Sequence, residues 1–162
     1  MSESLTASHL DALRTIFRAL SSTSVSWVVT GSMGFALRGF PLRAHDIDLQ
    51  TDAAGAYEIE RVFAASVIRP VAFSEAARIR SHFGALRIGE IDVEIMGDVQ
   101  HRRDDGTWAS PADLHRHQRL VKFAGMQVPV LSLEYEYQAY LKMGRRTRAE
   151  MIKEWMQWRT DS

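Results

Sequence analysis

The chain has 162 residues, 46% hydrophobic and 25% charged, which is the composition of a folded globular domain rather than a disordered segment. Twenty basic and twenty acidic residues cancel, which argues against a general nucleic-acid coat protein but leaves room for a local basic site. The absence of cysteine excludes disulfides, thiolate catalysis and cysteine-ligated zinc. No apolar run reaches the ~20 residues of a membrane span and no secretion signal is evident, so we expect a cytoplasmic protein without membrane contact.

The first part of the chain predicts alternating helices and strands. Apolar side chains recur at helical spacing after Ser8, which is the expected N-cap of the first helix. Later runs are either rich in β-branched and aromatic side chains or alternate polar with apolar, as strands do. In chain order we expect a helix over 8–20, a strand over 25–30, a short helix over 33–37, a strand over 45–50 and a helix over 54–65.

The second part predicts two hairpins, with turns near Gly89 and Gly125. The expected strands cover residues 78–88, 91–96, 119–123 and 127–131, and a loop is expected over 97–113. Two helices should follow. Ser132 caps the first, which runs to Met143, and Thr147 with Glu150 has the spacing of a capping box for the second.

These elements predict an α/β (α+β) fold, in which helices flank a mixed sheet. We expect the main domain to cover residues 1–131. Residues 132–162 should form a short C-terminal helical segment packed on the same domain.

The segment from Val28 to Gln50 carries the chemistry. A predicted strand leads into Gly31-Ser32, and residues 33–45 then separate this pair from Asp46-Ile47-Asp48-Leu49. Alternation along a strand places Asp46 and Asp48 on one face, where the two carboxylates repel each other. Carboxylates at this spacing suit Mg²⁺, and the alternative is a solvated strand edge with two surface acids.

Gly31 and Ser32 add a second feature. A glycine between a strand and a helix lets the backbone approach a ligand closely, and the free N–H groups at a helix start attract an anion. The alternative is an ordinary turn with Ser32 as a helix cap. Taken together with the acids, the turn predicts a phosphate cradle beside a metal-binding pair of carboxylates.

This pattern of Gly31-Ser32 followed by Asp46-Ile47-Asp48-Leu49 resembles the signature of the DNA polymerase β-like nucleotidyltransferase superfamily. Within it the chain looks most like the small bacterial enzymes of the aminoglycoside, lincosamide or toxin–antitoxin type. A weaker similarity extends to residues 91–96 and 132–146. The resemblance implies the nucleotidyltransferase fold and an enzyme that moves an NMP group from an NTP, by expectation ATP, to an acceptor hydroxyl with release of pyrophosphate.

The resemblance also implies a third carboxylate on a neighbouring strand. Asp92 and Glu94 share one face of the predicted strand, and we prefer Glu94 because Asp92 lies nearer the turn at Gly89. Asp92 stays as the alternative, and two solvated strand positions are a third reading. By resemblance, the catalytic and metal-binding residues would be Asp46, Asp48 and Glu94, holding two Mg²⁺ ions. The nucleotide-binding residues would be Gly31, Ser32, Arg43 and Lys142.

The acceptor is left open, as a small molecule, a protein or an RNA. Because few residues follow the predicted loop, we expect an acceptor site that is either open or completed by a homodimer or a partner chain. An alternative of another class is a non-catalytic nucleotide-binding or interaction module of the same fold. The intact Asp46, Asp48 and the acidic strand around Glu94 argue against that alternative.

Overall fold

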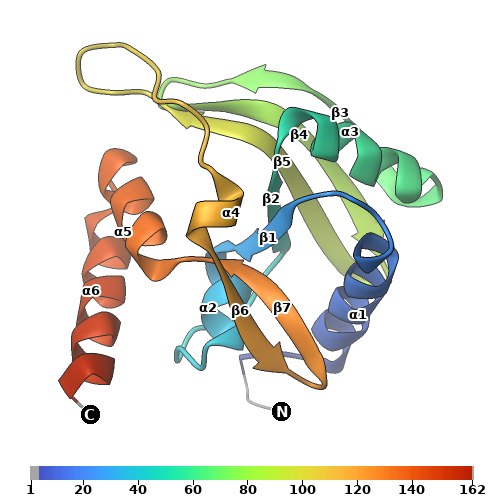
Figure 1. The fold of residues 1–162 in the computed structure, drawn as a ribbon, viewed down its shortest axis with the longest axis horizontal. Helices are drawn as coiled ribbons and strands as arrows, with labels where there is room; N and C mark the ends of the chain where they lie inside the picture. The colour runs from blue at the N-terminus through green and yellow to red at the C-terminus, as the bar shows by residue number, and fades with distance from the viewer. Residues whose placement is uncertain (1–3, 162) are drawn as a thin grey trace.

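The computed structural model describes residues 4–161, with side chains for residues 4–158. Its strands form one mixed sheet in the order β3-β4-β5-β2-β1-β7-β6 (Figure 1). They are β1 Trp27–Thr30, β2 Ile47–Thr51, β3 Val67–Glu75, β4 Ile79–Ile88, β5 Ile91–His101, β6 Gln118–Phe123 and β7 Met126–Leu131. The pairs β2–β5 and β1–β7 are parallel and the other neighbours are antiparallel. The predicted fold class is confirmed.

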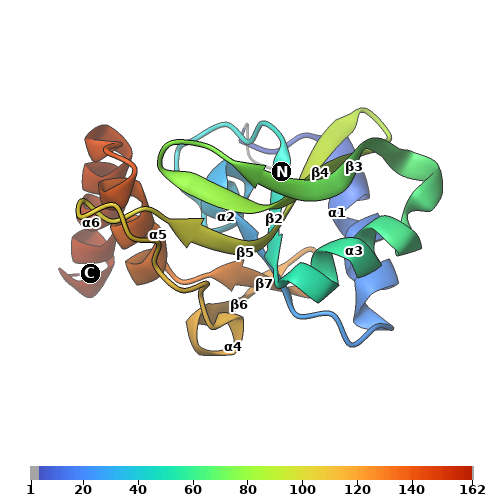
Figure 2. The same ribbon diagram turned by 90° about the horizontal axis from the view of Figure 1, so that it is seen from above.

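Helices cover the sheet and its ends. They are α1 Ala7–Ser21, α2 Gly31–Leu37, α3 Ala53–Val62, α4 Leu114–His117, α5 Leu133–Lys142 and α6 Arg146–Asp161, with a short 3₁₀ turn, η1, at Ala64–Ser66. Figures 1 and 2 both place α1 and α3 toward one end of the molecule and α5 and α6 side by side at the other. No helix within residues 4–161 is long and apolar enough to cross a membrane.

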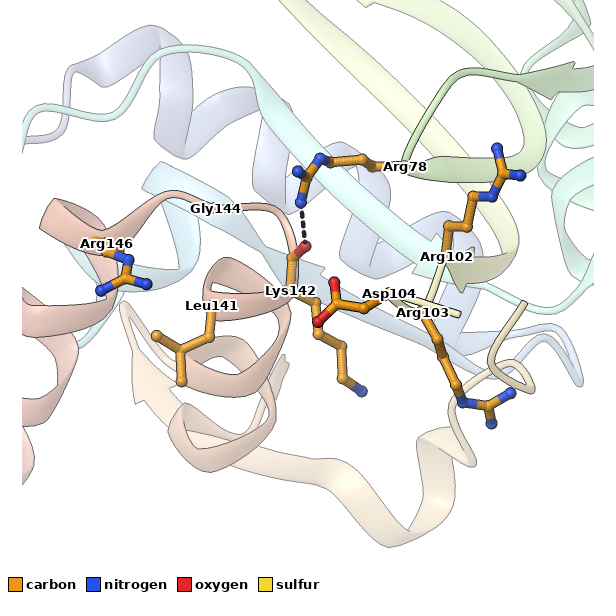
Figure 3. A pocket seen from close by; sticks show the side chains of 8 residues that line it. All are labelled: Arg78, Arg102, Arg103, Asp104, Leu141, Lys142, Gly144 and Arg146. Atoms are coloured by element: carbon orange, nitrogen blue, oxygen red, sulfur yellow. Dashed lines mark hydrogen bonds between the residues drawn. The ribbon is translucent and has the colours of Figure 1, made fainter. Parts of the chain in front are cut away.

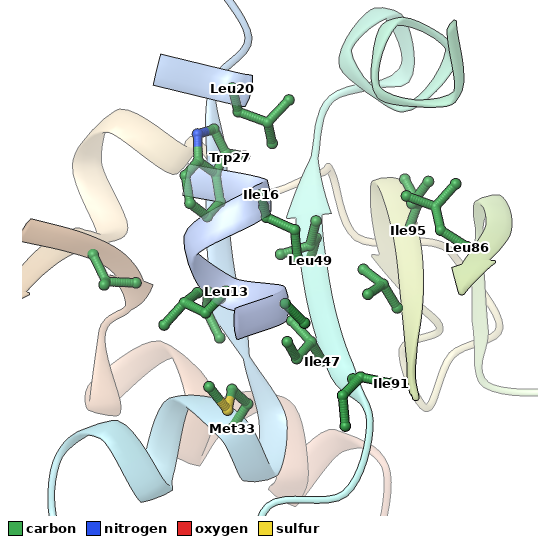
Figure 4. Packing of buried hydrophobic residues seen from close by; sticks show 14 of the residues in the cluster. Leu13, Ile16, Leu20, Trp27, Met33, Ile47, Leu49, Leu86, Ile91 and Ile95 are labelled. Atoms are coloured by element: carbon green, nitrogen blue, oxygen red, sulfur yellow. The ribbon is translucent and has the colours of Figure 1, made fainter. Parts of the chain in front are cut away.

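The main core lies between α1 and the sheet (Figure 4). Leu13 and Ile16 of α1 are fully buried and pack in one cluster with Ile47 and Leu49 of β2. Burial of side chains of this size stabilises the fold by about 1.5–3 kcal/mol each. Because side chains alternate along a strand, the inward direction of Ile47 and Leu49 turns Asp48 to the opposite face of the sheet.

A second cluster attaches the C-terminal helices. Phe35 of α2 and Phe40 pack with Tyr140 of α5 and with Ile152 of α6, all of them buried. Trp155 stacks on Phe40 with ring centroids 4.2 Å apart. This aromatic cluster sets the position of α5 against the start of α2.

Two predicted caps are wrong. The N-cap of α1 is Thr6, whose hydroxyl accepts from the backbone N–H of His9, while Ser8 lies within the helix. His9 follows Thr6 by three residues, which is the position that completes a capping box. Its ring Nδ1 accepts a hydrogen bond from the backbone N–H of Thr6. The last helix already begins at Arg146, so Thr147 lies inside its first turn and does not cap it.

The sheet is also larger than predicted. β3 was not expected because most of its side chains are exposed and it contains Pro70, so it lacks the alternation of a half-buried strand. β5 continues to His101, so residues 97–101 belong to this strand and not to the loop that we predicted. Gly97 and Asp98 resemble turn residues, yet pairing with β4 continues through a register shift opposite Arg80 and His82.

Candidate functional site

Pairing of three strands brings the motif residues together. Thr30 of β1 lies opposite Asp48 of β2, and Asp48 lies opposite Glu94 of β5. The three side chains therefore form a row across one face of the sheet, on the side away from α1. Asp48 and Glu94 are close enough for their carboxyl groups to share a hydrogen bond.

Asp48 is the perturbed acid of this row. Burial, as the largest cause, together with the neighbouring charges of Glu94, Asp46 and Glu136, raises the pKa of Asp48 to about 8. A carboxyl group in such a place holds a proton, which it donates to Glu94. The pair thus concentrates negative charge that a bound cation would compensate.

Steric constraints explain why the residue at position 31 is glycine. Gly31 has φ of +70°, and a Cβ at this position would lie 2.6 Å from Oδ2 of Asp48. Only glycine fits both the backbone angle and the close approach. Ser32 has another contact, since its Oγ accepts from the backbone N–H of His45 at 3.1 Å and so ties α2 to the residue before Asp46. The turn and Asp48 therefore meet in space, whereas Asp46 lies just outside β2.

Asp46 and Asp92 lie in more open places. Asp46 is exposed and comes directly before β2 begins. Asp92 shares a face with Glu94, but its Oδ1 accepts from Arg87 Nη1 at 2.7 Å in a partly exposed ion pair. Arg87 therefore already compensates the charge of Asp92, whereas Glu94 faces Asp48. This geometry favours Glu94 over Asp92 as the third carboxylate.

A buried acid that the sequence analysis did not single out completes the site. Glu136 of α5 is 3% exposed, and its Oε1 accepts a hydrogen bond from the hydroxyl of Thr30. Its Oε2 is buried and has no hydrogen-bond partner within the described part of the chain. Burial raises the pKa of Glu136 to about 7, although the hydrogen bonds from Thr30 and the Gly31 backbone oppose this shift.

The sequence contains a signal for Glu136. An acid in the first turn of a helix has an ordinary explanation, because the helix dipole favours negative charge there. However, Glu136 lies on the same helical stripe as Leu133, Tyr137 and Tyr140, which pack on the aromatic cluster. An acid within an apolar stripe is a candidate for a buried functional position.

These groups line a cavity of about 170 Å³, called here the carboxylate cavity. Asp48, Glu136, Thr30 and Gly31 contribute its polar wall on the sheet side. The other lining residues are Gln50, Ile79, Met96, Val99, His101, Ala139, Tyr140, Met143 and Arg145. The cavity therefore joins the strand row to α5 and to the segment that follows it.

Arg43 and Lys142 are not part of this lining. Arg43 is exposed in the segment before Asp46. Lys142 is exposed in the last turn of α5 and lines a separate cleft. The structure thus brings Gly31, Asp48 and Glu94 together and leaves these two cations outside.

The carboxylate oxygens of this site are the type of ligand that a magnesium ion prefers. Among the side chains described, those of residues 4–158, no group of three or more His, Cys, Asp or Glu is arranged to hold a metal ion as it stands. Even so, Asp48 and Glu94 offer hard oxygen donors, and the pKa of Asp48 near 8 reflects burial without a compensating positive charge. Mg²⁺ needs few protein carboxylates, because water and substrate phosphates fill its remaining positions.

The mixed sheet and the row of acids beside a glycine turn define a protein of the nucleotidyltransferase class. The chain belongs to the aminoglycoside-2''-adenylyltransferase family, whose sequence profile matches residues 12–155. A crystal structure from Thermotoga maritima, provisionally named a nucleotidyltransferase, is 54% identical with a TM-score of 0.81, and the match covers 92% of each chain.

Two antibiotic-modifying proteins share the fold at low identity. The solution structure of the antibiotic-resistance factor ANT(2'')-Ia has a TM-score of 0.65 at 13% identity, covering 94% of this chain and 86% of that one. The lincomycin-bound lincosamide adenylyltransferase LnuA has a TM-score of 0.60 at 15% identity, covering 93% and 98%. A comparison with curated proteins gave no match.

Proposed function

We propose that the protein is a Mg²⁺-dependent nucleotidyltransferase that moves AMP from ATP to an acceptor hydroxyl and releases pyrophosphate. The observation that supports it most is the half-buried pair of Asp48 and Glu94, with Asp48 directly beside Gly31. A protein that needed only a polar sheet face would not place two carboxyl groups in contact, because their repulsion destabilises the fold.

The reaction requires one bond to form and one to break. The acceptor oxygen attacks the α-phosphorus of ATP, and the bond from that phosphorus to the bridging oxygen of the β-phosphate breaks. Pyrophosphate then leaves with the electron pair. Positioning and compensation of negative charge supply most of the acceleration in such transfers.

The chain's own residues would have separate tasks. Glu94 would accept the proton of the attacking hydroxyl, as a positioned carboxylate can. Gly31 and Ser32 would lie beside the β- and γ-phosphates, where the absence of a Cβ permits close approach. Glu136 would hold the Thr30–Gly31 turn through its bond to Thr30.

Asp46, Asp48 and Glu94 would hold the metal. When bound, Mg²⁺ compensates the charge of the phosphates and activates the acceptor hydroxyl. Because Asp48 holds a proton in the metal-free protein, metal binding should release that proton to solution. Arg43 and Lys142 stay proposed nucleotide contacts that would have to reach in from outside the carboxylate cavity.

The test is pyrophosphate release from each of the four NTPs. The acceptors are aminoglycosides, lincosamides, tRNA and extract proteins, with and without Mg²⁺. We expect release with ATP and at least one acceptor, and its loss in Asp48→Asn and Glu94→Gln. Asp92→Asn is the matched control, since it removes a carboxylate from the same strand face. Tight binding of a non-hydrolysable ATP without any pyrophosphate release would support the non-catalytic module instead.

A second copy or a partner chain is proposed to complete the acceptor site. Sedimentation of the protein with and without the active acceptor measures this directly. A monomer in both conditions, with full activity, would contradict it.

A further inference from the structure

A cleft rich in arginine lies next to the carboxylate cavity. It has a volume of about 510 Å³ and is bounded by the β3–β4 turn, the end of β5 and the junction of α5 and α6. Figure 3 shows its cationic side chains, Arg78, Arg102, Arg103, Lys142 and Arg146. We call this set the basic cleft.

Positive charge is in excess in the basic cleft, although the charge of Arg103, after the hydrogen bonds from Thr107, helps to lower the pKa of nearby Asp105. Its five cations share the cleft with a single carboxylate, that of Asp104. None of the five forms an ion pair in the part of the chain that the structure describes, where ion pairs involve Arg61, Arg80 and Arg87. Like charges repel one another, and a bound anion would reduce that repulsion.

Neutral oxygens hold three of the guanidinium groups in place. Arg78 donates to the carbonyl of Lys142, and Arg102 donates to the carbonyl of Gly106, each at 3.2 Å. Arg103 donates to the Thr107 hydroxyl and the Trp108 carbonyl, both at 3.2 Å. These bonds orient the side chains without neutralising them, which leaves planar donors suited to phosphate oxygens.

The basic cleft adjoins the carboxylate cavity without sharing its lining. Lys142, Gly144 and Arg146 line the cleft, whereas Met143 and Arg145 of the same segment line the cavity. His101 lines the cavity, and its pKa is lowered by burial and by the nearby charge of Lys142. The two hollows therefore meet the same segment, residues 142–146, through different residues.

We propose that the basic cleft binds phosphate groups carried by the acceptor, so that the substrate class is a phosphate-bearing hydroxyl compound. This inference rests on the proposed function, which assigns the triphosphate of ATP to the Gly31–Ser32 turn and Lys142 to the nucleotide. The acceptor phosphates would therefore meet the four arginines of the cleft, Arg78, Arg102, Arg103 and Arg146. An acceptor with several amino groups would be repelled by the excess of positive charge in the cleft. The phosphates belong either to a nucleic-acid strand or to a small phosphorylated molecule.

The test measures binding rather than turnover. The probes are a labelled single-stranded RNA of about twelve nucleotides and a hexose bisphosphate, each titrated over a series of salt concentrations. The variant is Arg103→Gln with Arg146→Gln, and the matched control is Lys122→Gln with Lys153→Gln. Both pairs remove two exposed cations, but Lys122 and Lys153 lie outside the cleft.

We expect the variant to weaken binding of at least one probe tenfold or more, with the control within twofold of the wild type. If the RNA binds, its salt slope should fall by about two in the variant, one for each lost phosphate contact. RNA binding alone identifies a strand as the source, and binding of the bisphosphate identifies a small molecule. Either result supports the phosphate site.

Other results overturn it. No binding of either probe by the wild type, or equal losses in the variant and the control, would remove the site. A matching loss of affinity for non-hydrolysable ATP in the variant would assign the cleft to the nucleotide. The protein could also bind phosphate through the cleft and yet release no pyrophosphate with any acceptor. That result would contradict the proposed function and leave the phosphate site supported.

Discussion

Replacing Asp48 with Asn should make the metal-free protein more stable and inactive at once. The raised pKa of Asp48, about 8, means that its contribution to stability is present below the ordinary value of 3.8 and is lost as the pH rises through 8. The wild type must either keep a proton that the unfolded chain releases or bury a charge. Asn avoids both costs, and its amide can still donate to Glu94.

The structure sets the size of the effect. Between pH 5 and pH 8 each unit of pH adds about 1.4 kcal/mol to the difference between Asn and Asp, which gives at most about 4 kcal/mol. A change of 1 kcal/mol shifts the melting temperature of a domain of this length by about 2–4 °C. We therefore expect the advantage of Asp48→Asn over the wild type to grow by at most about 8–16 °C from pH 5 to pH 9.

Thermal melts in EDTA at several pH values measure this advantage. Asp92→Asn is the control, because its partly exposed pair with Arg87 contributes at most about 1 kcal/mol and should show little pH dependence over this range. A difference between Asp48→Asn and the wild type that stays constant with pH would refute the reasoning. A lower melting temperature for Asp48→Asn at every pH would make Asp48 a structural acid.

Four further outcomes follow from the same geometry. Glu94→Gln should lower pyrophosphate release by about 10²–10⁴, the range for a lost proton acceptor, while Asp92→Asn stays near the wild type; the reverse order would move the third carboxylate to Asp92. Gly31→Ala should lower the melting temperature by several degrees and abolish transfer, because its Cβ would meet Asp48 at 2.6 Å; a fully active Gly31→Ala enzyme would remove the cradle. Glu136→Gln should gain stability over the wild type as the pH rises through about 7, where the raised pKa of Glu136 makes its ionisation costly; melts that show no such gain would contradict the buried carboxyl. EDTA should weaken binding of non-hydrolysable ATP by tenfold or more in calorimetry, about 1.4 kcal/mol, and equal affinity would exclude a metal bridge between phosphates and carboxylates.

Much of the local structure could be predicted from the sequence because it depends on neighbours along the chain. The hairpin at Gly125 and the helix between Ser132 and Gly144 are examples, since turn residues and caps act within a few positions. The same holds for the spacing of Gly31 and Asp48, which carried the resemblance to nucleotidyltransferases. Alternation along β2 also predicted which face Asp48 occupies.

Contacts between distant segments decided the rest. Asp92 and Glu94 have the same pattern in sequence, and only the pairing of β5 with β2 and β4 places Glu94 against Asp48 and Asp92 against Arg87. The exposed edge strand β3 has no period-two signal, because its position in the sheet comes from pairing with β4.

Glu136 shows the limit most clearly. Its bond to Thr30 spans 106 residues and forms because the aromatic cluster brings α5 to the start of α2. The basic cleft likewise joins the β3–β4 turn, β5 and α6, which no local pattern connects. Side-chain periodicity along a chain reports which face a residue takes, whereas the identity of the group it meets there depends on how those faces pack in three dimensions.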